Sequence, residues 1–375
     1  MLESGYTWGD LRRGIDRAML AVTLLLFALG LLSIYSAGAG VRHASSAFAV
    51  RQLAWGGVGA CAYALILRVG YQRFLRWAGW IYGATLLTLA ALLAFGAVAK
   101  GAQSWFRVGS IGFQPAELGK VALILFLARF CSRYPLENVK NLFAAIFFSG
   151  ASIVLILLQP DLGSTLVYGT IVFAMLVVAG APGKYLAGLV AAGVVALPFF
   201  WGSLKTYQKL RLVVFLDPSV DPQGAGYNVI QSRIAVGSGG LWGKGFLQGT
   251  QGRLRFLPEP HTDFIFSVFA EEFGFVGGAV VVILFALLFW RLLRAAFRTK
   301  DIRAKMLSVG VVAWLWFQVM ESVAMSMGLA PITGLPLPLF SYGGSALLME
   351  AVALALVQSA AVSLSRERTG SLRDK

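Results

Sequence analysis

Asp263 is the acidic residue with the most suggestive surroundings in this sequence. It lies in RFLPEPHTDFIFSVFAEEFGF, residues 255–275, where a basic, proline-containing segment becomes strongly apolar. A carboxylate there can act as a general base or as a ligand of a divalent cation such as Mg²⁺ or Mn²⁺. The cations Lys244, Arg253 and Arg255 precede it along the chain and would suit an anionic substrate. The simpler alternative is that Asp263 only caps the helix that follows.

Glu117 and Lys120 form a second candidate site. They stand three residues apart in FQPAELGKVALILFLARF, so on a helix they share one face and could pair. Ionisable side chains inside a membrane are costly and usually mark a polar cavity or a functional site. A structural ion pair that only fixes helix packing is the alternative. Asp161 in QPDLGST raises a similar choice between a helix cap and a site residue.

Four further acids lie within apolar runs. Glu271 and Glu272 follow Asp263 on the same predicted helix, roughly 12 to 14 Å deeper at a rise of about 1.5 Å per residue. At about 100° per residue they cannot both share the face of Asp263, so we expect them to pair with a neighbouring helix. Glu321 and Glu350 are also in apolar runs, and the sequence identifies no partner for either.

A glycine- and proline-rich segment, MGLAPITGLPLPLFSYGGSALL, joins the last two apolar runs and contains Ser341 and Tyr342. Non-helical backbone at membrane depth is tolerated only where protein or a water-filled cavity shelters it, so a cavity-lining loop is predicted. An ordinary external turn is the alternative. Upstream, residues 227–236 are amphipathic and are predicted to lie along the outer interface. A flexible loop explains the glycine-rich run after them.

The composition identifies the elements that must position these residues. Of 375 residues, 58% are hydrophobic and 13% charged, which is typical of a polytopic membrane protein. The net charge of +15 is best explained by Lys and Arg in cytoplasmic loops, so no nucleic-acid partner is expected. Two cysteines and two histidines are too few for a disulfide framework or a histidine-based zinc site.

Ten apolar runs are long enough to be membrane-spanning helices. They cover residues 18–38, 48–67, 78–98, 115–131, 142–158, 161–181, 184–201, 264–290, 306–328 and 344–364. If the N-terminus is cytoplasmic, most basic residues fall in inner segments, as the positive-inside rule requires. We therefore predict an all-α integral membrane protein with both termini cytoplasmic. The chain 1–375 would form a single domain, with one long outer loop, about 202–263, between helices seven and eight.

Four segments, in this order, resemble the SEDS family. They are FQPAELGK, QPDLGSTL, GYNVIQSRIAVGSGGLWGKGFLQGTQGRLRFLPEPHTDFIFSVFAEEFGF and PITGLPLPLFSYGGS. Within the family, GKGFLQGTQ and FLPEPHTDFIF are more similar to the RodA group, which acts in rod-shape elongation, than to its division counterpart FtsW. The resemblance implies a peptidoglycan glycosyltransferase that polymerises lipid II on the outer face of the bacterial cytoplasmic membrane.

The resemblance also implies residue roles. Asp263 matches the family's essential aspartate and would be catalytic, either as a base or as a divalent-cation ligand. The residues expected to contact lipid II and the nascent glycan strand are Glu117, Lys120, Trp105, Gln114, Asp161, Lys244, Arg253, Arg255, His261, Thr262, Ser341 and Tyr342. Expected protein partners are a class B penicillin-binding protein, which crosslinks the strands, and other elongation-complex proteins. Two rival functions remain: a flippase or transporter of lipid-linked precursors, and a structural scaffold of that complex.

Overall fold

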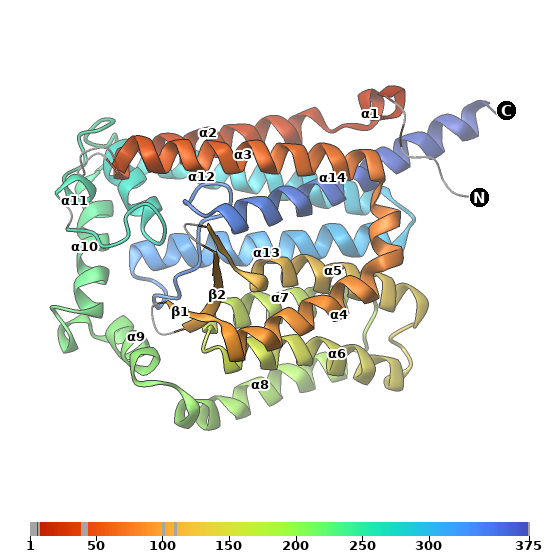
Figure 1. Cartoon of the computed structure of the whole chain (residues 1–375), viewed down its shortest axis with the longest axis horizontal. Coiled ribbons are helices and arrows are strands. Elements are labelled where there is room, and N and C mark those ends of the chain that lie inside the picture. The colour runs from red at the N-terminus through yellow and green to blue at the C-terminus, as the bar shows by residue number, and fades with distance from the viewer. Residues whose placement is uncertain are drawn as a thin grey trace.

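The computed structural model describes residue 6 and residues 8–38, 44–99, 102–108, 111–254 and 256–373. Its elements are α1 (Trp8–Gly14), α2 (Arg17–Ala37), α3 (Ala44–Val69), α4 (Tyr71–Phe95), β1 (Ala97–Ala99), β2 (Ala102–Val108), β3 (Ile111–Phe113), α5 (Pro115–Arg133), α6 (Val139–Leu158), α7 (Leu162–Val178), α8 (Gly183–Ser203), α9 (Thr206–Leu216), a 3₁₀ turn (Pro218–Val220), α10 (Ala225–Ser238), α11 (Thr250–Arg253), α12 (Ile265–Arg298), α13 (Ile302–Met327) and α14 (Gly344–Arg373). The long helices form a bundle, with α9 to α11 gathered at one end (Figure 1).

Each of the ten predicted apolar runs contains a helix, from α2 to α8 and from α12 to α14. Among the described helices, 7 are long and apolar enough to cross a membrane: α2, α3, α4, α6, α12, α13 and α14. The helices α7 and α8 offer shorter apolar segments, and α5 carries Glu117 and Lys120 in its first turns. The chain is therefore a nearly all-helical, multi-pass membrane protein, and ten crossings remain a prediction.

A small sheet between α4 and α5 corrects the all-α expectation. The strands β1, β2 and β3 pair antiparallel in that order. Trp105 lies in β2, and its ring covers Gly112 of β3, where an added Cβ would stand 3.0 Å from the indole. The sequence AQSWFRV is rich in residues that favour a pleated strand, but the connection is too short to show a periodic pattern. The sheet holds Trp105 close to the N-terminal end of α5.

The predicted outer loop is largely helical and packed on the bundle. Ser232 of α10 contacts Ser267 of α12 at 2.7 Å between hydroxyl oxygens, and its hydroxyl donates to the carbonyl of Ser326 at 2.6 Å. Arg233 donates to the carbonyl of Gly328 at 2.8 Å. The amphipathic stretch 227–236 thus covers α12 and α13. Protein therefore covers one face of this stretch, while Ile234 remains 44% exposed, and its position along the outer interface stays a prediction.

An ion pair joins two helices at the other end of the bundle. Arg291 of α12 donates to both carboxylate oxygens of Asp16, at 2.6 to 2.9 Å, while Asp16 caps α2 through the amide of Met19. Burial alone would raise the pKa of Asp16, but the hydrogen bonds and the charge of Arg291 outweigh it and lower that pKa.

We expect the ion pair to make stability depend on pH. Because the folded pKa of Asp16 lies below its ordinary value of 3.8, the pair stabilises the fold fully above that value and loses its effect as pH falls through the folded pKa. Thermal unfolding in detergent should show a steeper acid decrease in Tm for the parent than for Asp16→Asn. Equal slopes for the two proteins below about pH 4 would contradict this assignment.

Candidate active site

α12 is interrupted close to its start. Gly274 has φ 66° and ψ −165°, which separates a short half-helix, 265–273, from the long one that follows. The segment 240–245 enters the interruption and supplies partners for the freed backbone groups. The backbone amide of Phe275 donates to the carbonyl of Gly240 at 2.8 Å, and that of Val276 donates to the carbonyl of Leu241 at 3.1 Å. In return, the amides of Lys244 and Gly245 donate to the backbone carbonyls of Glu271 and Glu272 at 3.0 and 2.9 Å.

The glycine-rich run therefore has a specific structural role. Gly243 lies so close to α12 that a Cβ there would collide with the carbonyl of Glu272, and a Cβ at Gly274 would lie 2.6 Å from the carbonyl of Leu241. Residues 264–272 are buried by protein. Most of 264–275 therefore faces protein, with α2, α10, α11 and α13 packed against α12.

Asp263 immediately precedes this half-helix. The N-cap of α12 is Phe264, so the capping position does not belong to Asp263. The Asp263 side chain is half-buried, and one carboxylate oxygen lies 3.7 Å from the point where a Cβ would stand at Gly334. Gly334 has φ 74°, a conformation that favours glycine. The carboxylate is therefore directed toward the connection between α13 and α14.

That connection, residues 328–343, is here called the α13–α14 loop. Leu337, Leu339 and Phe340 within it are at most 4% exposed, although its backbone is not helical. The amide of Leu339 donates to Glu350 at 2.8 Å, and Thr333 donates to Glu321 at 2.7 Å. Both acids thus gain the partners that the sequence could not identify. Burial by protein excludes an ordinary external turn, and the prediction that the loop lines a cavity stays a prediction.

The α13–α14 loop also holds the residues just before Asp263. The hydroxyl of Ser341 donates to the carbonyl of Thr262 at 2.8 Å, and the amide of Tyr342 donates to the carbonyl of His261 at 2.9 Å. The His261 ring stacks on Phe48 with centroids 4.3 Å apart and lies 5.7 Å from the Tyr342 ring. Four predicted binding residues therefore surround the catalytic candidate, and α3 adds Phe48, which sequence reasoning missed.

Glu117 and Lys120 form a buried ion pair in α5. The Lys120 Nζ lies 2.6 Å from Glu117 Oε1, and the two side chains are 0% and 2% exposed. The ammonium also lies 5.0 Å from the centroid of the Trp314 ring. Within the described chain, Glu117 Oε2 has no hydrogen-bond partner. Glu350 of α14 lies within electrostatic range of the pair, so buried ionisable groups of α5 and α14 lie together beside the Trp314 ring of α13.

Lys120→Met should destabilise the protein by about 3 to 5 kcal/mol, because it leaves the buried Glu117 charge uncompensated. The double variant Glu117→Gln/Lys120→Met should recover most of that loss. Thermal unfolding in detergent measures both. A structural pair predicts that the double variant also regains activity, whereas a role toward substrate predicts a stable but inactive protein. A Lys120→Met protein as stable as the parent would contradict the expectation that the buried Glu117 charge needs a partner.

The structure describes three of the remaining predicted residues, Gln114, Asp161 and Arg253. Asp161 caps α7 by accepting from the amide and hydroxyl of Ser164 at 2.9 and 2.8 Å, and Gln114 Nε2 approaches it at 3.5 Å. The helix-cap interpretation of Asp161 is therefore confirmed. Arg253 ends α11 and is exposed, and Arg255 lies outside the described residues.

Lys244 is not the free cation that the sequence suggested. Its Nζ lies 2.6 Å from the buried carboxylate of Glu271, which also accepts from the amide and hydroxyl of Thr250 at 2.8 Å. Glu272 accepts instead from the hydroxyl of Ser36 in α2. The expected pairing with a neighbouring helix is thus confirmed for Glu272. Glu271 instead binds Thr250 at the start of α11 and Lys244 in the loop before it. The Lys244 ammonium also donates to the Thr250 hydroxyl at 3.1 Å, which leaves one of its three N–H donors for a substrate.

Comparison with known proteins identifies the fold. Residues 16–366 match the family model that joins FtsW, RodA and SpoVE, described as "Cell cycle protein". The chain belongs to the FtsW/RodA/SpoVE family. This membership confirms the resemblance inferred from the motifs around Glu117, Asp161, Asp263 and Ser341.

Members of the family match over nearly their whole length. "Peptidoglycan glycosyltransferase MrdB" of Escherichia coli strain K12 is 38% identical over 347 residues, covering 92% of this chain and 93% of that protein. "Stage V sporulation protein E" of Bacillus subtilis is 38% identical over 358 residues, covering 91% and 95%. "Peptidoglycan glycosyltransferase RodA" of Treponema pallidum is 32% identical over 418 residues, covering 92% and 96%.

Two solved structures in the family share the architecture. One, described as "Structural coordination of polymerization and crosslinking by a peptidoglycan synthase complex", has a TM-score of 0.79 at 32% identity and covers 94% of this chain and 98% of its own. The crystal structure of Thermus thermophilus rod shape determining protein RodA has a TM-score of 0.71 at 31% identity and covers 94% and 97%.

Proposed function

We infer that this chain is a peptidoglycan glycosyltransferase. The observation that carries the inference is its match, over 92% of its length, to a relative of that name, together with membership of the family over residues 16–366. The geometry is consistent with this class of enzyme. A half-buried carboxylate, Asp263, lies at one end of a helical bundle beside a sheltered non-helical loop and an aromatic group formed by Phe48, His261 and Tyr342.

The substrate we propose is lipid II, which presents a sugar linked to a polyprenyl pyrophosphate. The 4-hydroxyl of a GlcNAc acceptor attacks C1 of MurNAc, the bond from C1 to the pyrophosphate oxygen breaks, and undecaprenyl pyrophosphate leaves. The α-linked donor yields a β-1,4 bond, so the centre is inverted in a single displacement. One base suffices for that displacement, and the leaving group needs charge neutralisation more than protonation.

We assign the base role to Asp263. The carboxylate takes the proton of the acceptor hydroxyl, which requires hydrogen-bond contact with it in the complex. The half-buried position is suited to this step, since it limits water while leaving one side of the carboxylate accessible. His261, Thr262, Ser341 and Tyr342 position the approach to Asp263 through the contacts that join residues 261–262 to the α13–α14 loop.

A divalent cation, Mg²⁺ or Mn²⁺, is the alternative role for the same carboxylate. The described residues contain no group of three or more His, Cys, Asp and Glu that could hold a metal ion. Asp263 therefore fits only a cation shared with the substrate pyrophosphate, the usual arrangement for Mg²⁺. Such a cation would supply neutralisation of the leaving group. Exposed Arg253 offers positive charge from the protein itself, whereas the charge of buried Lys120 is compensated by Glu117 unless the substrate displaces that carboxylate.

The proposed setting is the bacterial cytoplasmic membrane. The chain would cross it ten times, with both termini in the cytoplasm and residues 202–263 and Asp263 on the outer side, as the distribution of basic residues favours. One solved relative comes from a structure described as a peptidoglycan synthase complex that polymerises and crosslinks. We therefore propose a class B penicillin-binding protein as the partner, together with other elongation-complex proteins and the nascent glycan strand.

A flippase is the rival function that one observation favours. The pair of Glu117 and Lys120, with Glu350 in electrostatic range, is a buried charged cluster of the kind that transporters place near the membrane midplane. Purified protein should polymerise labelled lipid II, alone or with its transpeptidase partner, and gel analysis of the products tests this. Movement of lipid II across reconstituted vesicles without polymer would favour the flippase, and neither activity would favour a scaffold.

A further inference from the structure

A basic cavity lies between α4 and α5, near the end of α5 farther from the candidate active site. Its volume is about 450 Å³, and its lining includes Arg76, Arg129 and Arg133 together with aromatic rings. α5 starts at Pro115, next to the Gln114 that approaches Asp161, and ends at Arg133, so Arg129 and Arg133 lie roughly 21 to 27 Å along the helix axis from its start. The cavity therefore belongs to the other membrane boundary.

The three arginines have no acidic counterpart. No carboxylate lines the cavity, and within the described chain none of the three forms an ion pair. Arg129 and Arg133 lie near the C-terminal end of α5, where the helix dipole favours a cation. Arg76 lies in the first two turns of α4, where the dipole disfavours one. The helix dipole thus explains the positions of Arg129 and Arg133 but not that of Arg76. The three positive charges repel one another unless an anion binds between them.

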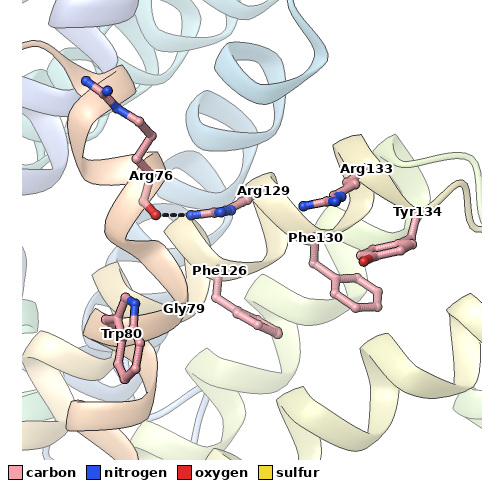
Figure 2. A pocket seen from close by; sticks show the side chains of 8 residues that line it. All are labelled: Arg76, Gly79, Trp80, Phe126, Arg129, Phe130, Arg133 and Tyr134. Atoms are coloured by element: carbon pink, nitrogen blue, oxygen red, sulfur yellow. Dashed lines mark hydrogen bonds between the residues drawn. The ribbon is translucent and has the colours of Figure 1, made fainter. Parts of the chain in front are cut away.

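The backbone of α4 holds one guanidinium in place. Arg129 Nη1 donates to the carbonyl of Leu75 at 3.0 Å and to that of Arg76. A guanidinium has five N–H donors, so this anchoring fixes the group and leaves most of its donors for a ligand. Arg133 is placed by its own ring contact, 5.8 Å from Tyr134. Figure 2 shows the guanidinium groups of Arg129 and Arg133 above the rings, with Arg76 directed away from them.

The other side of the cavity is apolar and continues along the bundle surface. Trp80 of α4 is 77% exposed. Phe126 and Phe130 contact Phe148 of α6, with ring centroids 5.8 and 6.2 Å apart, and the neighbouring Phe147 is 73% exposed. Rings at this level of a membrane protein pack against the boundary between headgroups and acyl chains. A ligand that matches both sides has an anionic head and an apolar tail.

We propose that this cavity binds the phosphate headgroup of an anionic membrane phospholipid. The guanidinium groups of Arg129 and Arg133 contact the phosphate, Arg76 adds its charge to the same surface, and the acyl chains lie along the exposed rings of α4 and α6. Basic pockets between membrane helices bind such headgroups by this combination of charge and apolar surface. An acidic peptide would match the arginines but not the exposed rings beside them, which favours the lipid.

The test uses the full-length protein, purified and delipidated in a neutral detergent, and titrated with phosphatidylglycerol or phosphatidylcholine. Native mass spectrometry counts retained lipid, and thermal unfolding reports stabilisation. We expect one saturable phosphatidylglycerol at least tenfold tighter than phosphatidylcholine. Arg76→Gln/Arg133→Gln should weaken it roughly 25-fold, at roughly fivefold per arginine near the membrane surface. Arg129 is left unchanged because it also holds α4.

Matched variants distinguish binding in this cavity from a general attraction of anionic lipid to a basic protein. Arg298→Gln removes an exposed charge at the end of α12, outside the cavity, and should leave the affinity within about twofold. Arg76→Lys/Arg133→Lys should retain most of the binding, and it serves as the test protein if the glutamine variant does not fold. Equal affinity for both lipids, an unchanged glutamine variant, or equal protection by soluble glycerol phosphate or an acidic peptide would overturn the proposal.

Discussion

Asp263→Asn is expected to lower lipid II polymerisation by roughly 10²- to 10⁴-fold, the usual contribution of a positioned general base. Asparagine keeps the size of the side chain but can neither take a proton from the acceptor hydroxyl nor neutralise a bound cation. The side chain is half-buried and lies just outside the N-cap of α12, so the substitution should cost little stability. The measurement is polymer formed from labelled lipid II by purified protein with its transpeptidase partner.

Glu137→Gln is the matched control for that experiment. Glu137 is an exposed carboxylate in the connection between α5 and α6, and its loss should leave polymerisation within about twofold, as for other exposed charges. Asp263→Asn protein that unfolds like the parent but polymerises at a near-parental rate would rule out both the base and the cation role. Full activity of the parent in excess chelator would eliminate the cation role alone.

Gly274→Ala should destabilise the protein by at least about 3 kcal/mol. A non-glycine residue at this φ and ψ costs about 1 to 3 kcal/mol, and the new Cβ would also collide with the amide of Gly243 and the carbonyl of Leu241. Backbone atoms cannot rotate away as a side chain can, so segment 240–245 must separate from α12. Thermal unfolding in detergent, together with the fraction of monodisperse protein, measures the loss.

Gly278→Ala is the control for the glycine prediction. It lies one turn later in regular helix, where an added Cβ meets only Phe266 ring atoms at 3.4 and 4.0 Å, so it should be neutral or stabilise by up to about 1 kcal/mol. Gly243→Ala attacks the same contact from the other side and should resemble Gly274→Ala, because its Cβ would meet the Glu272 carbonyl. Parental stability of both variants would show that the two backbones need not approach so closely.

The interruption of α12 also explains how a long helix can serve the site. Its 34 residues would extend roughly 50 Å, which is more than the hydrocarbon core of a bilayer. The break lets the part after Gly274 cross the membrane while the buried half-helix, 265–273, remains among α10, α11 and the α13–α14 loop. Asp263 is thereby held just before a short buried helical element that packs against protein.

Much of the fold could be predicted because hydrophobicity is a local property. A run of about 20 apolar residues must be helical in a bilayer, where no water satisfies the backbone, so all ten helices were located from the sequence. The same logic predicted that the backbone around Phe340 is sheltered. The strands around Trp105 and the helices within 202–263 were missed. Their segments are short and of mixed polarity, and contacts with the bundle rather than local pattern stabilise them.

The candidate site divides in the same way. Spacing alone predicted that Glu117 could pair with Lys120, because residues three apart on a helix lie on the same face within reach of each other. Asp263 could be chosen from its charged neighbours and the family motifs, although the roles of the site residues remain predictions. Three contacts could not be inferred from the sequence: the ion pair of Lys244 with Glu271, the approach of Asp263 to Gly334 and the stacking of Phe48 on His261. Each joins segments far apart along the chain.

The sequence by itself therefore determined a helical membrane protein, the order of its apolar helices and the carboxylate on which catalysis is proposed to depend. These follow from composition, periodicity and motifs that need no long-range contact. Only the tertiary structure decided which cations are free, where α12 breaks and which loop faces Asp263. Those outcomes depend on backbone approach at Gly243 and Gly274 and on burial of charges that attract partners from other helices. Neither backbone distance nor burial is encoded in any one stretch of residues.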